Sequence, residues 1–210
     1  MRLGPSVRSM FGRYERRFTE LFRSFYINID AFVELVMQWK PNAAAVLEVG
    51  CGEGAVTQHL SATYPQAQIT AIDITPRVGR LYTGAASAVR FARCTAQEIA
   101  AAEPGHYDLV VLSDVLHHVP PQFRQGILHA IRMALAPGGT LVFKEWQKNR
   151  SLIHLLCYAS DRFVTGDQVS YMTREEMRAM LSITFGAGSL VAESRVGPRW
   201  NNLAIAVHAS

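Results

Sequence analysis

Residues 46–54 read VLEVGCGEG, and this stretch decides the fold class. Four residues that suit a buried strand precede three glycines at alternate positions, Gly50, Gly52 and Gly54, and one acidic residue, Glu48, lies within the strand-like part. Glycine lets the backbone approach a bound molecule closely, because it has no side chain and tolerates left-handed angles. The stretch therefore predicts a strand, a ligand-binding turn and then a helix.

From residue 45 onward, strand and helix patterns alternate along the chain. Strands are expected at 45–49, 68–73, 89–94, 107–113, 140–145, 189–195 and 202–209. Helices are expected at 54–64, near 97–103, at 121–136, from a Thr173–Glu176 capping box to about Phe185, and after Thr75-Pro76. Repeated strand–helix units predict a Rossmann-like, doubly wound α/β fold, a parallel sheet with helices on both faces. The connector at 196–201 is too short for a crossover helix, so the last two strands should pair antiparallel.

Two segments fall outside this alternation. Residues 1–42 carry apolar side chains at helical spacing, which predicts an N-terminal helical cap segment before a domain at 43–210. Residues 146–172 form an insertion after the fifth strand, and ligands of doubly wound folds bind beyond the carboxyl ends of the strands. The insertion is therefore expected to wall the substrate pocket. The candidate substrate contacts are the aromatic residues Tyr14, Phe18, Trp146, Tyr158, Tyr171 and Trp200.

Composition narrows the classes of protein. Of 210 residues, 49% are hydrophobic and 18% charged, which is typical of one globular domain. No apolar run approaches the ~18–20 residues of a membrane span. Three cysteines without metal-binding spacing favour reduced thiols in a cytoplasmic protein and no metal. The formal net charge is +4, and six arginines against two glutamates between residues 2 and 23 suit an anionic substrate, RNA or lipid surface.

The glycine turn has two interpretations. Gly50, Gly52 and Ala55, with Asp73 about twenty residues later, fit the spacing of a dinucleotide-binding turn, which would indicate an NAD-dependent oxidoreductase. Glu48 favours a cationic ligand instead, because a buried carboxylate repels a pyrophosphate. S-adenosylmethionine (AdoMet) carries a sulfonium and an ammonium group. Asp73, at the end of the second strand, can accept hydrogen bonds from both ribose hydroxyls. The set of residues therefore favours AdoMet.

Five motifs in order resemble the class I AdoMet-dependent methyltransferases of the small-molecule type. They are VLEVGCGEG, AIDIT around Asp73, FARCTAQE (91–98), YDLVVLSDVLHHV (107–119) and LAPGGTLVF (135–143). The resemblance covers 46–145 and implies a seven-stranded sheet in the order 3-2-1-4-5-7-6 with strand 7 antiparallel. It also implies the cofactor contacts, which are Glu48, Gly50, Cys51, Gly52, Gly54, Asp73, Ile74, Thr95, Ala96, Gln97, Ser113, Asp114, Val115 and His118.

The chain departs from this family after the third strand. The family often has an acid there, which contacts the adenine amine, whereas this chain has Thr95-Ala96-Gln97. The backbone amide of Ala96 and the side chain of Gln97 are the expected replacements.

Three side chains near the ends of the fourth and fifth strands are candidates for catalysis: His117, His118 and Glu145. A neutral imidazole can take a proton from an acceptor hydroxyl, and Glu145 is a rival base. Methyl transfer is an in-line displacement at an activated carbon, so a route without a base also stays open.

The absence of one motif reduces the range of possible methyl acceptors. An Asn-Pro-Pro-aromatic motif, which would indicate methylation of an amino group on a base or glutamine, is replaced by Ser113–Leu116. We predict O-methylation of a small aromatic, polyketide-like or lipid-like acceptor, with N- or C-methylation left open. The alternatives are an RNA methyltransferase, an NAD-dependent oxidoreductase and a non-catalytic AdoMet-binding protein. A nucleic-acid partner is not expected, while the N-terminal segment offers a peripheral membrane or lipid contact.

Overall fold

The computed structural model describes residues 28–149, 154, 169–198 and 201–209. Its centre is a seven-stranded sheet in the order β3-β2-β1-β4-β5-β7-β6. The strands are β1 (Ala45–Val49), β2 (Gln68–Asp73), β3 (Val89–Arg93), β4 (Tyr107–Ser113), β5 (Leu135–Trp146), β6 (Leu190–Arg195) and β7 (Asn202–His208). Neighbours from β3 to β5 pair parallel, and β7 pairs antiparallel with both β5 and β6. The predicted fold class, strand order and reversed strand are confirmed.

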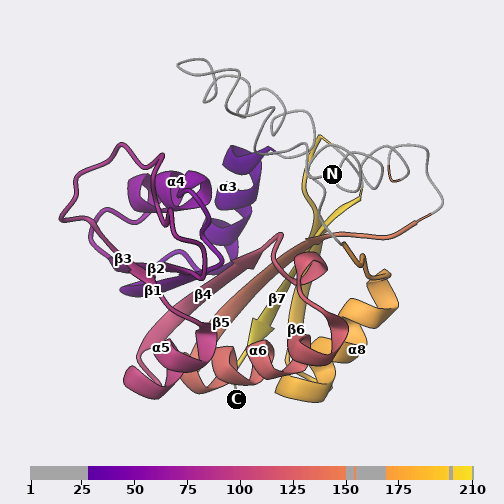
Figure 1. Cartoon of the computed structure of the whole chain (residues 1–210). Helices are drawn as coiled ribbons and strands as arrows, with labels where there is room; N and C mark the ends of the chain where they lie inside the picture. The colour runs from indigo at the N-terminus through magenta and orange to yellow at the C-terminus, as the bar shows by residue number, and fades with distance from the viewer. Residues whose placement is uncertain (1–27, 150–153, 155–168, 199–200, 210) are drawn as a thin grey trace.

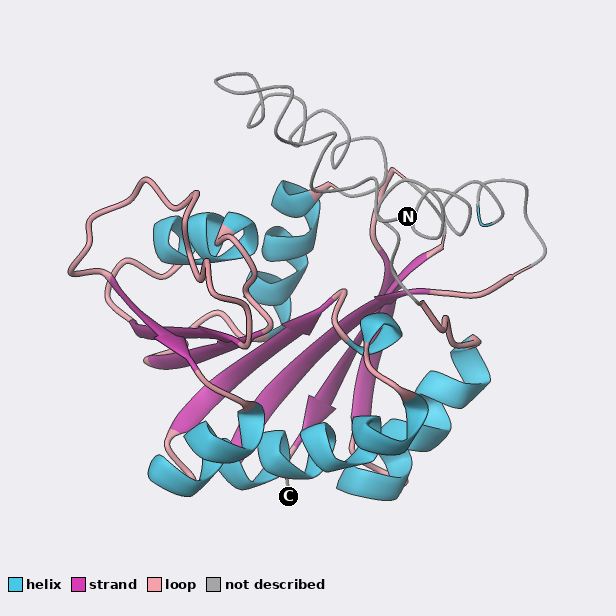
Figure 2. Cartoon of the chain, viewed as in Figure 1, coloured by secondary structure: helices cyan, strands magenta, loops and turns pink. Residues whose placement is uncertain are grey.

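Helices cover both faces of the sheet (Figure 1). On one face lie α3 (Ile29–Trp39) and α4 (Ala55–Thr63), and on the other lie α5 (Ala96–Ala102), α6 (Pro121–Ala134) and α8 (Arg174–Phe185). A short 3-10 helix, η2 (Leu116–His118), follows β4. Figure 2 shows the three layers, with the sheet between two layers of helices. Within the described ranges, no helix combines the length and apolarity needed to cross a membrane.

Each face of the sheet has its own apolar core, and β4 contributes to both. Its side chains alternate between faces, so Val110 and Leu112 join the core beneath α5, α6 and α8, while Leu109 and Val111 join the core beneath α3 and α4. All four side chains are fully buried. Burying each contributes about 1.5–3 kcal/mol to folding, which explains why this strand is almost entirely apolar.

Helix α3 belongs to the second core. The Asn28 side chain caps it by accepting the Ala31 amide at 3.0 Å, and Phe32, Val33 and Val36 are buried on its inner face. The rest of the predicted N-terminal cap segment, residues 1–27, lies outside the described residues. The division of the chain at residue 42 stays a prediction.

Two boundaries differ from the prediction by more than one residue. The helix expected at 121–136 ends at Ala134, and β5 begins at Leu135 instead of residue 140. Leu135 is extended, with ψ 133°, and pairs with Tyr107 of β4. Pro137 follows closely and lacks the amide that a continuing helix would need.

The helix expected after Thr75-Pro76 is also absent, since residues 76–81 form turns. Gly79 within them has a φ of +65°, and a Cβ there would lie 2.4 Å from the Phe91 ring. Phe91 leaves no room for a side chain at position 79. The positive φ of Gly79 is incompatible with a regular helix.

Candidate functional site

The glycine turn joins β1 to α4 with a left-handed backbone. Its glycines have φ values of +77° (Gly50), +53° (Gly52) and +94° (Gly54). The amides of Gly50 and Cys51 donate to the carbonyl of Ile72 at 2.8 and 3.0 Å, which holds the turn against the end of β2. A Cβ on Gly52 would meet no atom within 4 Å. The turn therefore presents open space beside its backbone, as a cradle for a ligand requires.

Asp73 ends β2 directly beside this turn. Its Oδ2 accepts the Gly52 amide at 2.8 Å, and its Oδ1 accepts the Thr75 amide at 2.8 Å. A carboxylate has about four lone-pair positions, so each oxygen can accept one more hydrogen bond. Adjacent ribose hydroxyls supply two such donors, and the geometry fits the predicted ribose contact.

Asp73→Asn is expected to weaken AdoMet binding by about 1.5–3 kcal/mol, roughly 10- to 150-fold, because a charged acceptor is lost while the shape is kept. Isothermal titration calorimetry measures the change. Asp108→Asn is a control at the other end of the sheet, where Asp108 accepts the Ala44 and Ala45 amides. Equal AdoMet affinity in Asp73→Asn and wild type would remove Asp73 from the site.

Glu48 is a buried acid behind the turn. Its Oε2 accepts a hydrogen bond from Thr57 Oγ1 at 2.6 Å. Burial raises the pKa of Glu48 to about 7, with Asp73 adding to the rise and the Thr57 hydrogen bond opposing it. A nearby cation would favour the ionised form. Burial likewise raises the pKa of the Cys51 thiol, which disfavours the reactive thiolate form.

AdoMet affinity should therefore increase as the pH rises toward about 7. Below that pKa, Glu48 must lose a proton to face a cation, and affinity falls by up to about tenfold per pH unit. Calorimetry from about pH 5.5 to 7, in buffers of different ionisation enthalpy, should detect proton release. Glu48→Gln should abolish the release, and affinity that is constant or higher at low pH would contradict a Glu48–cation contact.

In the cofactor-free protein, the raised pKa of Glu48 makes the stability of the folded state decrease as the pH rises. The folded-state pKa of about 7 lies above the reference value of 4.5. Glu48 therefore favours the folded state at low pH, and this contribution is lost as the pH rises from 4.5 to about 7.

The predicted adenine contacts follow β3, and Ile74, a predicted cofactor contact, follows β2. Thr95 caps α5, where its Oγ1 accepts the Glu98 amide at 3.2 Å in a capping box, so its side chain is engaged by the helix. Ala96 is buried and Gln97 is exposed. Ile74, next to Asp73, leaves 68% of its surface exposed. The exposed Ile74 offers an apolar surface for a flat ring beside the ribose position.

The two histidines after β4 have different surroundings. His117 is buried and His118 is exposed. The Nδ1 of His117 lies 2.6 Å from Oε2 of Glu145, which is fully buried at the end of β5. The other oxygen, Oε1, accepts the Val115 and Leu116 amides at 2.9 and 2.5 Å. Burial alone would oppose the charged carboxylate, but His117 and the Leu116 amide lower the pKa of Glu145.

A series of aromatic contacts begins at His117. Tyr171 stacks on it with ring centroids 5.1 Å apart, and His154 meets Tyr171 edge-on at 5.2 Å. Trp146 Nε1 donates to His154 Nδ1 at 3.0 Å. Trp146 and Tyr171 are buried at 4% and 8% exposure, so they support the imidazoles more than they line an open pocket. The other predicted substrate contacts, Tyr14, Phe18, Tyr158 and Trp200, lie outside the described residues.

Two residues near His117 were missed by sequence reasoning. His154 lies in the insertion, and its position in that substrate-side segment was the available signal. Arg124 on α6 is buried and donates to the carbonyls of Val119 at 2.9 Å and Ser170 at 2.6 Å. The Ser170 amide in turn donates to the His117 carbonyl at 2.8 Å. Arg124 therefore ties the end of the insertion to η2, and nothing in its local sequence indicates this.

Asp114, His117 and Glu145 place ligand-capable atoms within 4.8 Å of one another. Other contacts already account for these atoms. The Nζ of Lys144 lies 2.8 and 2.6 Å from the two carboxylate oxygens of Asp114, while backbone amides and His117 engage Glu145. We assign the cluster to this hydrogen-bonded ion-pair network.

A family model described as "Methyltransferase domain" matches residues 16–183. The chain belongs to this methyltransferase family. A ubiquinone biosynthesis O-methyltransferase of Xanthomonas campestris pv. campestris (strain B100) is 37% identical over 102 residues, which cover 47% of this chain and 41% of that protein. The protein of that name from Bordetella pertussis is 31% identical over 109 residues, covering 50% and 43%. The matched part of this chain thus spans about two fifths of the length of these relatives.

Solved structures show the same fold as this methyltransferase. The 1,6-didemethyltoxoflavin-N1-methyltransferase of Burkholderia thailandensis has a TM-score of 0.69 at 16% identity, over 97% of this chain and 87% of its own. The S-adenosylmethionine-dependent methyltransferase SibL has a TM-score of 0.71 at 17% identity, over 92% of this chain and 57% of its own. Identities this low establish the fold alone.

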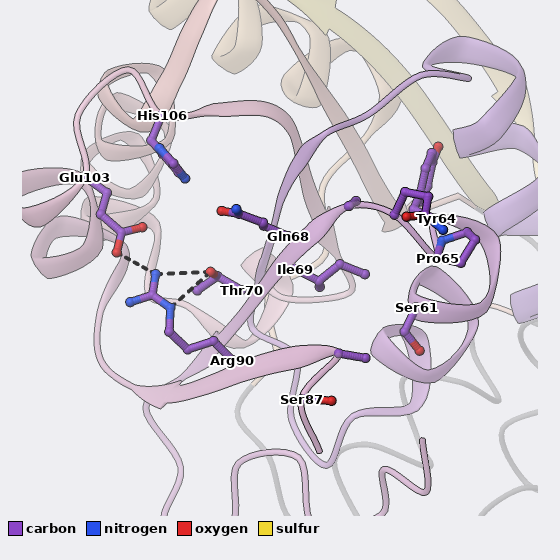
Figure 3. Close-up of a pocket in the computed structure, with 13 residues that line it drawn as sticks. Ser61, Tyr64, Pro65, Gln68, Ile69, Thr70, Ser87, Arg90, Glu103 and His106 are labelled. Atoms are coloured by element: carbon purple, nitrogen blue, oxygen red, sulfur yellow. Dashed lines mark hydrogen bonds and ion pairs between the residues drawn. The ribbon is translucent and has the colours of Figure 1, made fainter. Parts of the chain in front are cut away.

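A hollow of about 660 Å³ lies elsewhere on the methyltransferase, where β2 and β3 begin (Figure 3). Arg90 borders it, and its guanidinium is engaged by Glu103 Oε1 at 2.5 Å and Thr70 Oγ1 at 3.1 Å. The amino ends of parallel strands lie opposite the glycine turn, whereas ligands of this fold bind at the carboxyl ends. We therefore place the site at the turn and not in this hollow.

Proposed function

We propose that this methyltransferase transfers the methyl group of AdoMet to an oxygen of a small aromatic, polyketide-like or lipid-like acceptor. One observation carries the proposal: a buried carboxylate, Glu145, holds the imidazole of His117 at the carboxyl ends of β4 and β5. Hydroxyl acceptors benefit from a base that removes their proton, and an oriented imidazole is suited to that role. The relatives named as O-methyltransferases support an oxygen acceptor.

The residues around the glycine turn fit AdoMet, which supplies an electrophilic methyl group on sulfur when bound. Glu48 would face its positive charge, and Asp73 would accept its ribose hydroxyls. The open space beside Gly52 admits the ligand without a side-chain clash. Ile74, Thr95, Ala96 and Gln97 would border the adenine, and Ser113, Asp114, Val115 and His118 the methionine portion.

His117 would act as the base, with Glu145 as its positioning residue. The Glu145 carboxylate accepts a hydrogen bond from Nδ1–H, which places the lone pair of a neutral imidazole on Nε2. Nε2 would accept the proton that the acceptor hydroxyl loses on methylation, while the methyl–sulfur bond of AdoMet breaks and S-adenosylhomocysteine leaves. The resulting imidazolium is stabilised by the buried carboxylate. Because Glu145 is fully buried and engaged by two amides, it is a poor candidate for contacting the acceptor itself.

A methyl-transfer assay tests this proposal. The protein is incubated with methyl-tritiated AdoMet and a panel of hydroxybenzoates, dihydroxybenzoates, a prenylated phenol, matched aromatic amines and total RNA. We expect label in phenolic products, with mass spectrometry locating the methyl group on oxygen. Label confined to amines or RNA would contradict O-methylation. AdoMet binding without transfer to any acceptor, including a small-molecule extract, would favour a non-catalytic AdoMet-binding protein.

The basic, aromatic N-terminal segment is proposed to contact a lipid-like acceptor or the membrane surface that carries it. Its charge pattern supports this, and its residues before 28 lie outside the described part of the chain. A cytoplasmic location is part of the same proposal, and it is supported by the free thiols of Cys51 and Cys94.

A further inference from the structure

Lys144 and Glu145 are consecutive residues near the end of β5, so their side chains leave opposite faces of the sheet. Both nevertheless contact one short segment after β4, Asp114–His117. Glu145 binds its amides and its imidazole. The Nζ of Lys144 contacts both carboxylate oxygens of Asp114, and the carbonyl oxygen of Lys144 accepts the Asp114 amide at 2.9 Å.

The Lys144 ammonium is buried, with only 1% of the side chain exposed, while Asp114 is 26% exposed. A buried ammonium is costly unless a carboxylate compensates for the lost water. Apolar side chains of similar volume would support a sheet at least as well as a buried ion pair. The pair is therefore better explained by its effect on Asp114 than by its contribution to stability.

Asp114 has a φ of +55°, and among the described residues no other non-glycine residue has a positive φ. A left-handed backbone is unfavourable for an L-residue, although aspartate adopts it more readily than most, and such conformations persist where the surroundings fix them. The contacts with Lys144 fix both the main chain and the side chain of Asp114. They therefore determine the direction in which the chain leaves β4.

The direction in which the chain leaves β4 determines the positions of Val115 and His117. Val115 packs against the first glycine of the turn, since a Cβ on Gly50 would lie 2.3 Å from Val115 Cγ2. His117, two positions further on, reaches Glu145. One turn of the backbone thus connects the cofactor cradle with the candidate base.

We infer that Lys144 is a positioning residue for methyl transfer. Its ion pair with Asp114 holds residues 114–117 in the conformation that packs Val115 on the glycine turn and keeps His117 on Glu145. The role in catalysis rests on the proposed function of His117. The structural effect on His117 does not, and it can be measured without cofactor or acceptor.

Lys144→Met removes the charge and keeps most of the volume. In the cofactor-free protein, the Nδ1–H proton of His117 should give a far-downfield NMR signal in the wild type, assigned with ¹⁵N-histidine labelling and the His117→Gln variant. We expect this signal to shift upfield or broaden in Lys144→Met. The Kd of AdoMet should rise about 3- to 10-fold, because Val115 would pack less well on the glycine turn. The kcat should fall roughly 10- to 100-fold, because a small misplacement of His117 is costly in catalysis.

Lys144→Arg should retain part of the activity and the signal, because it can still pair with Asp114. Asp114→Asn tests the same pair from its partly exposed side and replaces Lys144→Met if that variant does not fold. Lys40→Met, at the C-cap of α3, is the matched control and should leave every readout unchanged.

A lower Tm for Lys144→Met with the His117 signal, kcat and Kd of wild type would overturn the inference. A shifted signal in a protein that never transfers methyl groups would uphold the positioning and reject the proposed function.

Discussion

Replacing His117 with glutamine should lower kcat by about 100- to 10,000-fold, the usual contribution of a general base. Glutamine keeps an amide that can donate to Glu145, so the local fold should survive, but it cannot accept a proton. The Kd of AdoMet should change by less than about threefold, because His117 is assigned to the acceptor side of the site. The loss should therefore appear in turnover with a phenolic acceptor and not in cofactor binding.

His129→Gln on α6 is the matched control, since His129 is exposed and distant from the site in the sequence and should retain wild-type turnover. His118→Gln should have the smaller effect of the adjacent pair, because His118 is exposed, whereas His117 is buried with its Nδ1 2.6 Å from Glu145. Full turnover by His117→Gln would show that His117 does not take the proton, and full turnover by His118→Gln as well would exclude both imidazoles.

Replacing Gly50 with alanine should reduce AdoMet affinity by more than about 100-fold. A Cβ at this position would lie 2.3 Å from Val115 Cγ2, and the backbone has a φ of +77°. Left-handed strain costs about 1–2 kcal/mol and overpacking about 1–3 kcal/mol. Because relief of the clash must displace either the turn or Val115, the cofactor cradle is distorted even where the protein folds.

The Gly105→Ala variant separates the effect of backbone strain from the effect of a steric clash. Gly105 has a φ of +63°, and a Cβ there would meet no atom within 4 Å. It should lower the free energy of unfolding by about 1–2 kcal/mol and leave AdoMet affinity intact. Chemical denaturation and calorimetry on both variants give the comparison. If Gly50→Ala binds AdoMet as tightly as Gly105→Ala, the close packing of Val115 on the turn has no part in cofactor binding.

The fold was predictable because its signals are local. The glycine turn follows an apolar strand directly, and β4 is apolar throughout because both its faces are covered. The strand order came from the family resemblance and was confirmed. The false helix after Thr75-Pro76 arose because a favourable start was outweighed by the packing of Gly79 on Phe91, which a linear pattern does not contain.

The site was only partly predictable, since its decisive contacts cross between strands. Glu145 was a rival base in the sequence, and its bond to His117 joins residues 28 positions apart. That bond depends on the register of β4 and β5, where Ser113 lies opposite Lys144. The Lys144–Asp114 pair depends on the same register. The hydrogen bond between Trp146 and His154 is likewise not specified by the spacing of the two residues in the sequence.

The central claim is that a cationic cofactor binds across the glycine turn, between Glu48 and Asp73. Calorimetric titration of the wild-type protein with AdoMet, and separately with NADH, tests it most directly. AdoMet should bind with one-to-one stoichiometry and release a proton near pH 6.5, while NADH should produce no binding heat. Saturable binding of NADH without binding of AdoMet would contradict the account.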